Sequence, residues 1–123
     1  MSASFSKNVV VLGTGGTIAG LKASASSEAG YDAAQLGIEK LTRQSQLQAR
    51  VQALGVDLLT EQVAQIDSKD MERGVWHELA LRCAAHLDDP NVSALVITHG
   101  TDTMAETAYW LSRLFASADK PLV

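Results

Sequence analysis

Apolar residues are distributed along this chain in two different patterns. Residues 8–12 and 94–98 are short apolar runs rich in β-branched side chains, and a third strand-like stretch ends near Ile66. The first run is continuous rather than alternating, which is typical of a strand buried on both faces of a parallel sheet. The pattern therefore predicts three strands, the first of which ends at Gly13.

Between and after these strands, apolar residues return every three or four positions, as on one face of a helix. Gly55 and the Asp-Asp-Pro segment at 88–90 are helix stop signals. Thr103 and Glu106 have the spacing of a capping box at the start of the third helix. The three predicted helical faces carry Leu47, Val51 and Leu54; Trp76, Leu79, Ala80, Cys83 and Leu87; and Met104, Ala108, Leu111 and Phe115.

The order of these elements is strand, helix, strand, helix, strand, helix, and residues 120–123 open a further strand. Alternation of this kind is typical of α/β architecture. We therefore predict an α/β fold of three layers, with a mostly parallel sheet and helices on both of its faces. Residues 22–36 are rich in Ser, Ala and Gly and lack a period, so we expect a long loop there.

Composition narrows the classes of function without choosing one. The chain has 123 residues, of which 46% are hydrophobic and 20% charged, and a net charge of −4, which fits one globular domain. The charged residues form no basic stripe, so the electrostatic footprint of a nucleic-acid binder is missing and we predict no nucleic-acid partner. The apolar runs are too short to span a bilayer and the N-terminal residues lack a secretory signal, so we predict a cytoplasmic protein without membrane contact.

Cysteine and histidine residues give no sign of a metal site. The single cysteine, Cys83, excludes an internal disulfide and a multi-cysteine zinc site, and its apolar helical neighbours predict a buried thiol. His77 and His86 are nine residues apart, which is not the spacing of helical metal ligands. His99 is expected to form structural hydrogen bonds rather than to act as a base. Packing roles are expected for the aromatic residues Trp76, Tyr109 and Trp110.

A polar cluster follows each of the three predicted strands. In open α/β sheets, ligands bind outside the carboxyl ends of the strands, where these clusters would lie. Because polar turns end most strands, ordinary turn chemistry is an equal alternative. The clusters are Thr14 and Thr17; Ser68, Lys69 and Asp70; and His99, Thr101 and Asp102.

The glycine-rich stretch LGTGGTIAG at 12–20 fits neither common phosphate-binding fingerprint. Ile18 stands where a dinucleotide fingerprint requires its third glycine, and the lysine of a P-loop is missing. The glycines can instead present Thr17 and backbone N–H donors. A threonine nucleophile needs a proton acceptor, and Thr101 beside Asp102 offers a second hydroxyl next to a carboxylate.

Three motifs carry a resemblance to a known family. The stretches TGGTIAG at 14–20 and VITHGTDTMAETA at 96–108 resemble the two signature motifs of the bacterial-type L-asparaginases. IDSKDM at 66–71 is similar to the family's substrate-binding turn. The resemblance extends over residues 8–123.

The resemblance implies a role for each matching residue. Thr17 would be the nucleophile that attacks the side-chain amide of asparagine, and Tyr31 would help to orient it. Ser68 would hold the α-carboxylate of the substrate and Asp102 its α-ammonium group. Thr101 resembles the second catalytic threonine, which works with a lysine further along the family's chain.

Lys69 departs from the family pattern, because many members have glutamine at the matching position. Its charge would strengthen carboxylate binding or tune the preference between asparagine and glutamine; the alternative is a lysine that points into solvent. The implied partner is L-asparagine, with L-glutamine as a second substrate. The resemblance implies no metal or organic cofactor, and a homo-oligomer for the full-length member.

The family's chains are much longer than this one. By resemblance, residues 1–123 are a partial N-terminal asparaginase-like domain without the C-terminal domain, and we expect this chain alone to be nearly or wholly inactive. Two other interpretations remain open at this point. One is a non-catalytic α/β module that binds a small molecule or nucleotide, and the other is an inactive fragment.

Overall fold

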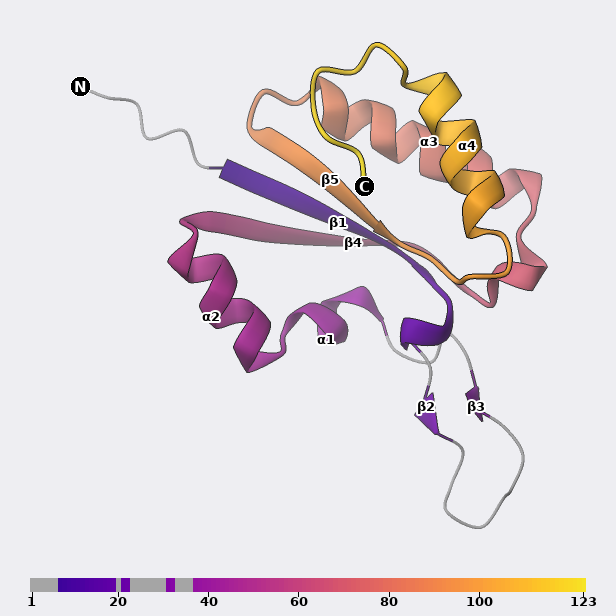
Figure 1. Cartoon of the computed structure of the whole chain (residues 1–123), viewed down its shortest axis with the longest axis horizontal. Coiled ribbons are helices and arrows are strands. Elements are labelled where there is room, and N and C mark those ends of the chain that lie inside the picture. The colour runs from indigo at the N-terminus through magenta and orange to yellow at the C-terminus, as the bar shows by residue number, and fades with distance from the viewer. Residues whose placement is uncertain (1–6, 20, 23–30, 33–36) are drawn as a thin grey trace.

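A parallel sheet of three strands, in the order β4-β1-β5, forms the centre of the fold. The computed structural model describes residues 7–19, 21–22, 31–32 and 37–123 (Figure 1). The elements in chain order are β1 (Lys7–Gly15), η1 (Thr17–Ala19), β2 (Leu21–Lys22), β3 (Tyr31–Asp32), α1 (Ile38–Thr42), α2 (Ser45–Ala53), β4 (Val56–Ile66), η2 (Ser68–Asp70), α3 (Arg73–Asp88), β5 (Val92–Thr98) and α4 (Met104–Leu114).

Helices cover both faces of the sheet, which confirms the predicted three-layer α/β class. Figure 1 shows α1 and α2 on one side of the strands and α3 and α4 on the other. β1 runs parallel to both of its neighbours. Where a further strand was predicted at the end of the chain, the structure has a single parallel bridge, between Leu122 and Leu95.

The main core lies between the sheet and the pair α3 and α4. Val10 and Leu12 of β1 are fully buried there, together with buried side chains from α3, β5 and α4. Because side chains alternate along a strand, Val11 faces the opposite layer. The other buried members of this core are Leu79, Cys83, Val92, Leu95 and Leu111. Burial of Cys83 was predicted, and it raises the pKa of the thiol to about 11.

The prediction that Gly13 ends the first strand is wrong. β1 continues to Gly15, and Gly13 pairs with Gln62 of β4 and Thr98 of β5. A central strand with a partner on each side retains its hydrogen-bond ladder through a glycine. The lack of a side chain at Gly13 also allows α1 to approach, since a Cβ there would lie 2.6 Å from Cβ of Ile38.

The predicted capping box at the start of α4 is also wrong. Thr103 is the residue before the helix, but its side chain makes no cap hydrogen bond. Its hydroxyl donates instead to the carbonyl oxygen of Ser68, at 2.9 Å. The Thr103 hydroxyl therefore bonds to the neighbouring turn instead of capping its own helix.

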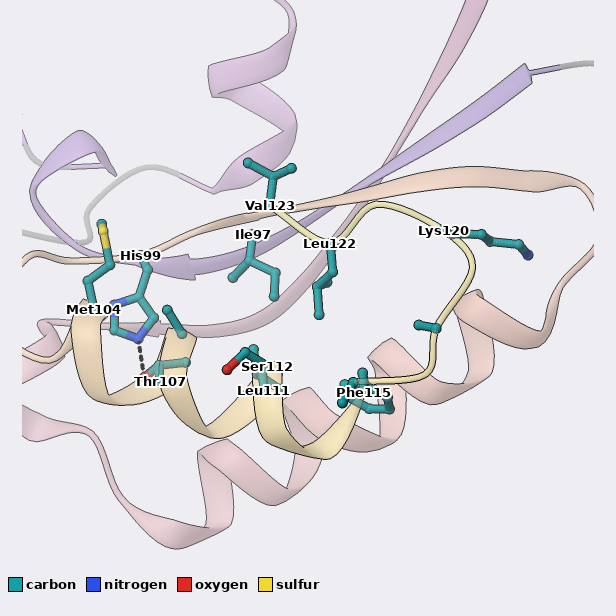
Figure 2. A pocket seen from close by; sticks show the side chains of 13 residues that line it. Ile97, His99, Met104, Thr107, Leu111, Ser112, Phe115, Lys120, Leu122 and Val123 are labelled. Carbon is teal, nitrogen blue, oxygen red and sulfur yellow. Dashed lines mark hydrogen bonds between the residues drawn. The ribbon is translucent and has the colours of Figure 1, made fainter.

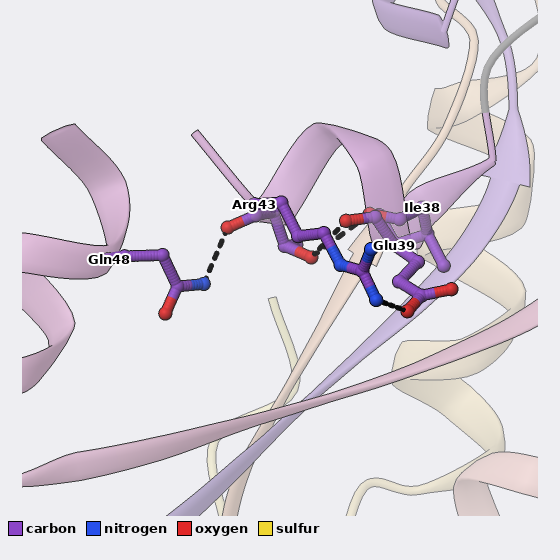
Figure 3. A network of polar contacts seen from close by, with 5 residues as sticks. Ile38, Glu39, Arg43 and Gln48 are labelled. Atoms are coloured by element: carbon purple, nitrogen blue, oxygen red, sulfur yellow. Dashed lines mark hydrogen bonds and ion pairs between the residues drawn. The ribbon is translucent and has the colours of Figure 1, made fainter. Parts of the chain in front are cut away.

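The helix predicted before Gly55 forms as α2, and Gly55 ends it with a left-handed φ of +64°. Its apolar face is not buried as an amphipathic pattern would suggest, since Leu54 is 75% exposed. A short helix that the sequence pattern did not predict, α1, precedes it. The side chain of Gln48 donates to the carbonyl oxygen of Thr42 at 2.6 Å. Figure 3 shows Arg43 paired with Glu39.

The predicted loop at 22–36 lies mostly outside the described residues. At its two ends, β2 and β3 pair antiparallel, Leu21 with Asp32 and Lys22 with Tyr31. The prediction of a loop did not include this strand pair.

Among the described residues, every helix is too short or too polar to cross a membrane. Of the three aromatic residues expected to pack, Trp76 and Trp110 stack at 5.5 Å between ring centroids, whereas Tyr109 is 69% exposed because it lies on the outer side of α4.

Candidate functional site

Three turns meet at the carboxyl ends of β1, β4 and β5. The closest approach is between backbones: a Cβ on Gly16 would lie 2.5 Å from Cα of Gly100. A Cβ on Gly100 would lie 2.5 Å from Oγ of Ser68. Gly16 also has a φ of +80°, which side chains rarely tolerate. The glycines of both signature motifs therefore allow the turns to pack against each other.

Ser68 connects the turn after β4 to the turn after β5. Its Oγ accepts the backbone N–H of Asp102 at 3.1 Å, and its carbonyl oxygen accepts the hydroxyl of Thr103 at 2.9 Å. Ser68 is only 2% exposed, and both of these hydrogen bonds are partly buried. The predicted candidates Ser68 and Asp102, which are 34 residues apart, are thus held next to each other.

The turn that carries Ser68 and Lys69 is a short 3₁₀ helix capped by Asp67. The Asp67 side chain accepts the backbone N–H of Lys69 at 3.3 Å, and its carbonyl oxygen accepts that of Asp70 at 2.9 Å. These bonds hold the backbone of the turn while the side chain of Lys69 remains exposed. Lys69 therefore contributes a positive charge at the surface, one residue from Ser68.

Thr17 begins the 3₁₀ turn η1 directly after Gly16. The N–H of Gly16 donates to the carbonyl oxygen of Ile66 at 2.9 Å, which fastens this loop to the end of β4. The backbone of Thr17 therefore lies at the same edge of the sheet as that of Ser68. The side chains of Thr17 and of Tyr31, which lies in β3, are outside the described part of the structure.

The turn after β5 presents two of the predicted candidates to solvent. Thr101 and Asp102 are both exposed, whereas Gly100 before them is buried. Thr14, which the sequence grouped with Thr17, has a structural role instead. It is 2% exposed, and its hydroxyl donates to the carbonyl oxygen of Thr98 at 2.7 Å, joining the ends of β1 and β5.

His99 forms structural hydrogen bonds, as predicted. The side chain is 8% exposed, and both ring nitrogens have partners. Nδ1 lies 2.6 Å from the carbonyl oxygen of Gly100, and Nε2 lies 2.9 Å from Oγ1 of Thr107. The ring therefore points into the protein, beneath the turn, and away from the exposed Thr101 and Asp102.

A cavity of about 440 Å³ lies beside this turn, between α4 and the last residues of the chain. Figure 2 shows its walls, which are formed largely by apolar side chains such as Leu111, Phe115 and Leu122. Its polar side chains at one end, His99 and Thr107, are bonded to each other. An amino acid with two charged α-groups requires converging charged partners, so the turns at the strand ends fit such a ligand better than this cavity does.

Residues that fix the turns were missed by sequence reasoning as functional residues. Gly16 and Gly100 act through close backbone approach, Asp67 by capping the turn, and Thr107 through buried hydrogen bonds. Their main sequence signal is membership of the motifs. Within the described ranges, no three His, Cys, Asp or Glu side chains come together in a group able to hold a metal ion.

Comparison with known proteins agrees with the family resemblance of the three motifs. The family model described as "Asparaginase, N-terminal" matches residues 8–123. A glutaminase-asparaginase of Pseudomonas fluorescens biotype A is 46% identical over 118 residues, which cover 94% of this chain and 31% of that protein. A probable periplasmic L-asparaginase of Haemophilus influenzae is 40% identical over 116 residues, with coverages of 94% and 31%.

Among solved structures, a probable cytoplasmic L-asparaginase from Campylobacter jejuni is similar to this fold. The TM-score is 0.70 at 41% identity, and the match covers 85% of this chain and 31% of that one. The present chain thus spans about a third of the length of these relatives.

Proposed function

Because this chain belongs to the asparaginase family, whose N-terminal domain it matches, we propose that it takes part in hydrolysing the side-chain amide of L-asparagine to L-aspartate and ammonia. L-Glutamine is a second proposed substrate, since the relative from P. fluorescens is described as a glutaminase-asparaginase. The observation that carries the proposal is the hydrogen bond from the N–H of Asp102 to Oγ of Ser68, at 3.1 Å. It joins two of the three motifs at the strand ends.

The α-groups of the substrate are assigned to the two turns that this bond joins. Asp102 is exposed, and its carboxylate offers a partner for the α-ammonium group. The hydroxyl of Ser68 accepts one hydrogen bond and carries its own hydrogen, which it donates to the α-carboxylate. Lys69, which is exposed and adjacent in sequence, adds a positive charge near this turn. Fixing both α-groups positions the amide for attack.

Thr17 is the proposed nucleophile. Tyr31 orients the hydroxyl of Thr17, the hydroxyl oxygen bonds to the side-chain amide carbon, and the hydroxyl proton passes to the amide nitrogen. The carbon–nitrogen bond then breaks, ammonia leaves with the added proton, and an aspartyl ester of Thr17 remains. Water then attacks the ester carbon, and the bond between that carbon and Oγ1 of Thr17 breaks. The proton of the water passes through the hydroxyl of Thr101 to Oγ1 of Thr17, which restores the nucleophile and releases L-aspartate.

A chimera that has the full length of a known relative tests this function. Residues 8–123 replace the matched third of the P. fluorescens protein, and ammonia release from L-asparagine and L-glutamine is measured. We expect release by the chimera, a loss of more than about 10³-fold in Thr17→Ala, and a loss of roughly 10²–10⁴-fold in Thr101→Ala. The 123-residue chain is assayed beside it, and we expect little or no release from that chain alone.

The matched control is Thr60→Ala, a threonine of β4 that lies outside the three turns. It should leave the rate within about twofold, as expected for a substitution away from the site. A folded chimera that releases no ammonia, or a Thr17→Ala variant that keeps its rate, would contradict the proposed function.

We also propose that the protein works in the cytoplasm. The C. jejuni neighbour, at 41% identity, is described as cytoplasmic, whereas the H. influenzae relative, at 40%, is described as periplasmic. Fractionation of the source cells decides between the two compartments, and recovery in a periplasmic extract would refute the assignment.

A further inference from the structure

A chain of buried and partly buried hydrogen bonds runs from α3 through α4 to the turn after β5. The indole Nε1–H of Trp76 donates to Oγ1 of Thr107 at 2.8 Å. Thr107 Oγ1 lies 2.9 Å from Nε2 of His99, and Nδ1 of His99 lies 2.6 Å from the carbonyl oxygen of Gly100. The chain therefore ends on the backbone directly before Thr101.

With the imidazole of His99 neutral, the two ends of this chain determine the direction of every hydrogen bond in it. The indole of Trp76 can only donate, and the carbonyl of Gly100 can only accept. Nδ1 of His99 must therefore carry a hydrogen, and Nε2 of the neutral ring must accept. The hydroxyl of Thr107 accepts from Trp76 and donates to His99, so each of its roles is determined.

From this arrangement we propose that Thr107 is a positioning residue for the site. It acts through His99 to hold the carbonyl of Gly100, and thereby the turn that presents Thr101 and Asp102. The functional part of the proposal rests on the function proposed above, because those two residues matter only if they meet the substrate. Ser68 holds the turn from one side, and the bonds through Thr107 hold it from the other.

Packing alone does not account for a threonine at this position. Thr107 is 3% exposed, and a valine would fill nearly the same volume. Valine would, however, leave the N–H of Trp76 and Nε2 of His99 without this partner in a buried region, which is unfavourable. The hydroxyl therefore serves to orient the imidazole.

The first test needs no variant and no activity. Nitrogen-15 NMR of the purified 123-residue chain reports which ring nitrogen of each histidine carries the hydrogen. We expect the neutral form of His99 to be protonated at Nδ1. Protonation of its neutral ring at Nε2 would overturn the proposal.

The second test uses Thr107→Val, Thr107→Ser and a matched control, Thr42→Val. Thr42 is also a buried helical threonine, but its hydroxyl bonds only to backbone carbonyls of its own helix, those of Ile38 and Glu39. Hydrogen exchange of the Asp102 amide measures how firmly the turn is held. We expect exchange about tenfold faster in Thr107→Val, with Thr107→Ser and Thr42→Val close to the parent chain.

Equal acceleration in Thr42→Val would indicate general loosening and refute a specific role for Thr107, as would unchanged exchange in Thr107→Val. In the chimera, we expect Thr107→Val to lower kcat/KM for L-asparagine about tenfold and Thr107→Ser to restore it. A chimera without activity would remove the proposed function, while the tautomer and exchange measurements would still decide whether Thr107 positions the turn.

Discussion

At the scale of single residues, Gly100 determines how closely the turns after β4 and β5 approach. A Cβ at this position would lie 2.5 Å from Oγ and 2.8 Å from Cβ of Ser68, closer than side chains can pack. We expect Gly100→Ala to destabilise the chain by about 1–3 kcal/mol, because the two turns must separate. Urea unfolding of the purified chain measures this loss.

Gly74 provides the control for that substitution. It lies in the first turn of α3, and the nearest atom to a Cβ there is Oε1 of Glu72, at 3.8 Å. Since alanine favours helices over glycine, Gly74→Ala should stabilise the chain by about 0.5–1 kcal/mol. Two glycine-to-alanine changes with the same sign would argue against close packing as the role of Gly100.

Cys83 gives stability a pH dependence in the alkaline range. Burial raises the pKa of its thiol from 9.0 to about 11, so folding favours the neutral form. This contribution is fully present below pH 9.0 and is lost as the pH rises through about 11. We expect the free energy of unfolding to fall more steeply over this range in the parent chain than in Cys83→Ala, measured by urea unfolding. Parallel pH profiles would rule out the effect.

At the scale of elements, periodicity predicted most of the strands and helices, because each is long enough to show its own pattern. Periodicity failed where contacts with residues distant in the sequence determine the local structure. Gly13 continues its strand because β4 and β5 flank it, and Thr103 bonds to Ser68 rather than to its own helix. Similarly, the turns of the site were located from the strand order, while the orienting role of Thr107 depends on contacts with His99 and Trp76 that no local pattern contains.

A charged cluster links two of these elements, β4 and α3. Glu61 of β4 contacts Nη1 of Arg82 at 3.0 Å and Nε2 of His86 at 2.7 Å. The hydrogen bond from Arg82 to Glu78, and then the charge of Glu61, raise the pKa of Arg82. We expect Glu61→Gln to lower the urea midpoint, with a smaller loss at high salt, because ions screen partly exposed pairs.

The control for this pair is Glu39→Gln, which breaks an exposed ion pair with Arg43 within the region of α1. It joins no separate elements, so its effect should be smaller than that of Glu61→Gln. The reverse order would show that the cluster does not fasten α3 to the sheet.

At the scale of the whole molecule, the two faces of the sheet are covered unequally. The face beneath α3 and α4 holds the main core, in which Leu79 and Leu95 are fully buried. On the other face, α1 buries Ile38 and Thr42, but α2, which is described in full, has no buried side chain. Stability is therefore expected to be concentrated on the α3 and α4 side.

Hydrogen exchange of the native chain tests this asymmetry. Amides of α2 should exchange through local opening at a lower free energy than amides of α3, because opening α2 exposes little apolar surface. Leu79→Ala, which should cost about 2–5 kcal/mol, should then speed exchange in α3 by roughly a hundredfold and leave that of α2 nearly unchanged. If both helices responded alike, the molecule would open only as one unit, and the site turns would be as stable as the core that carries them.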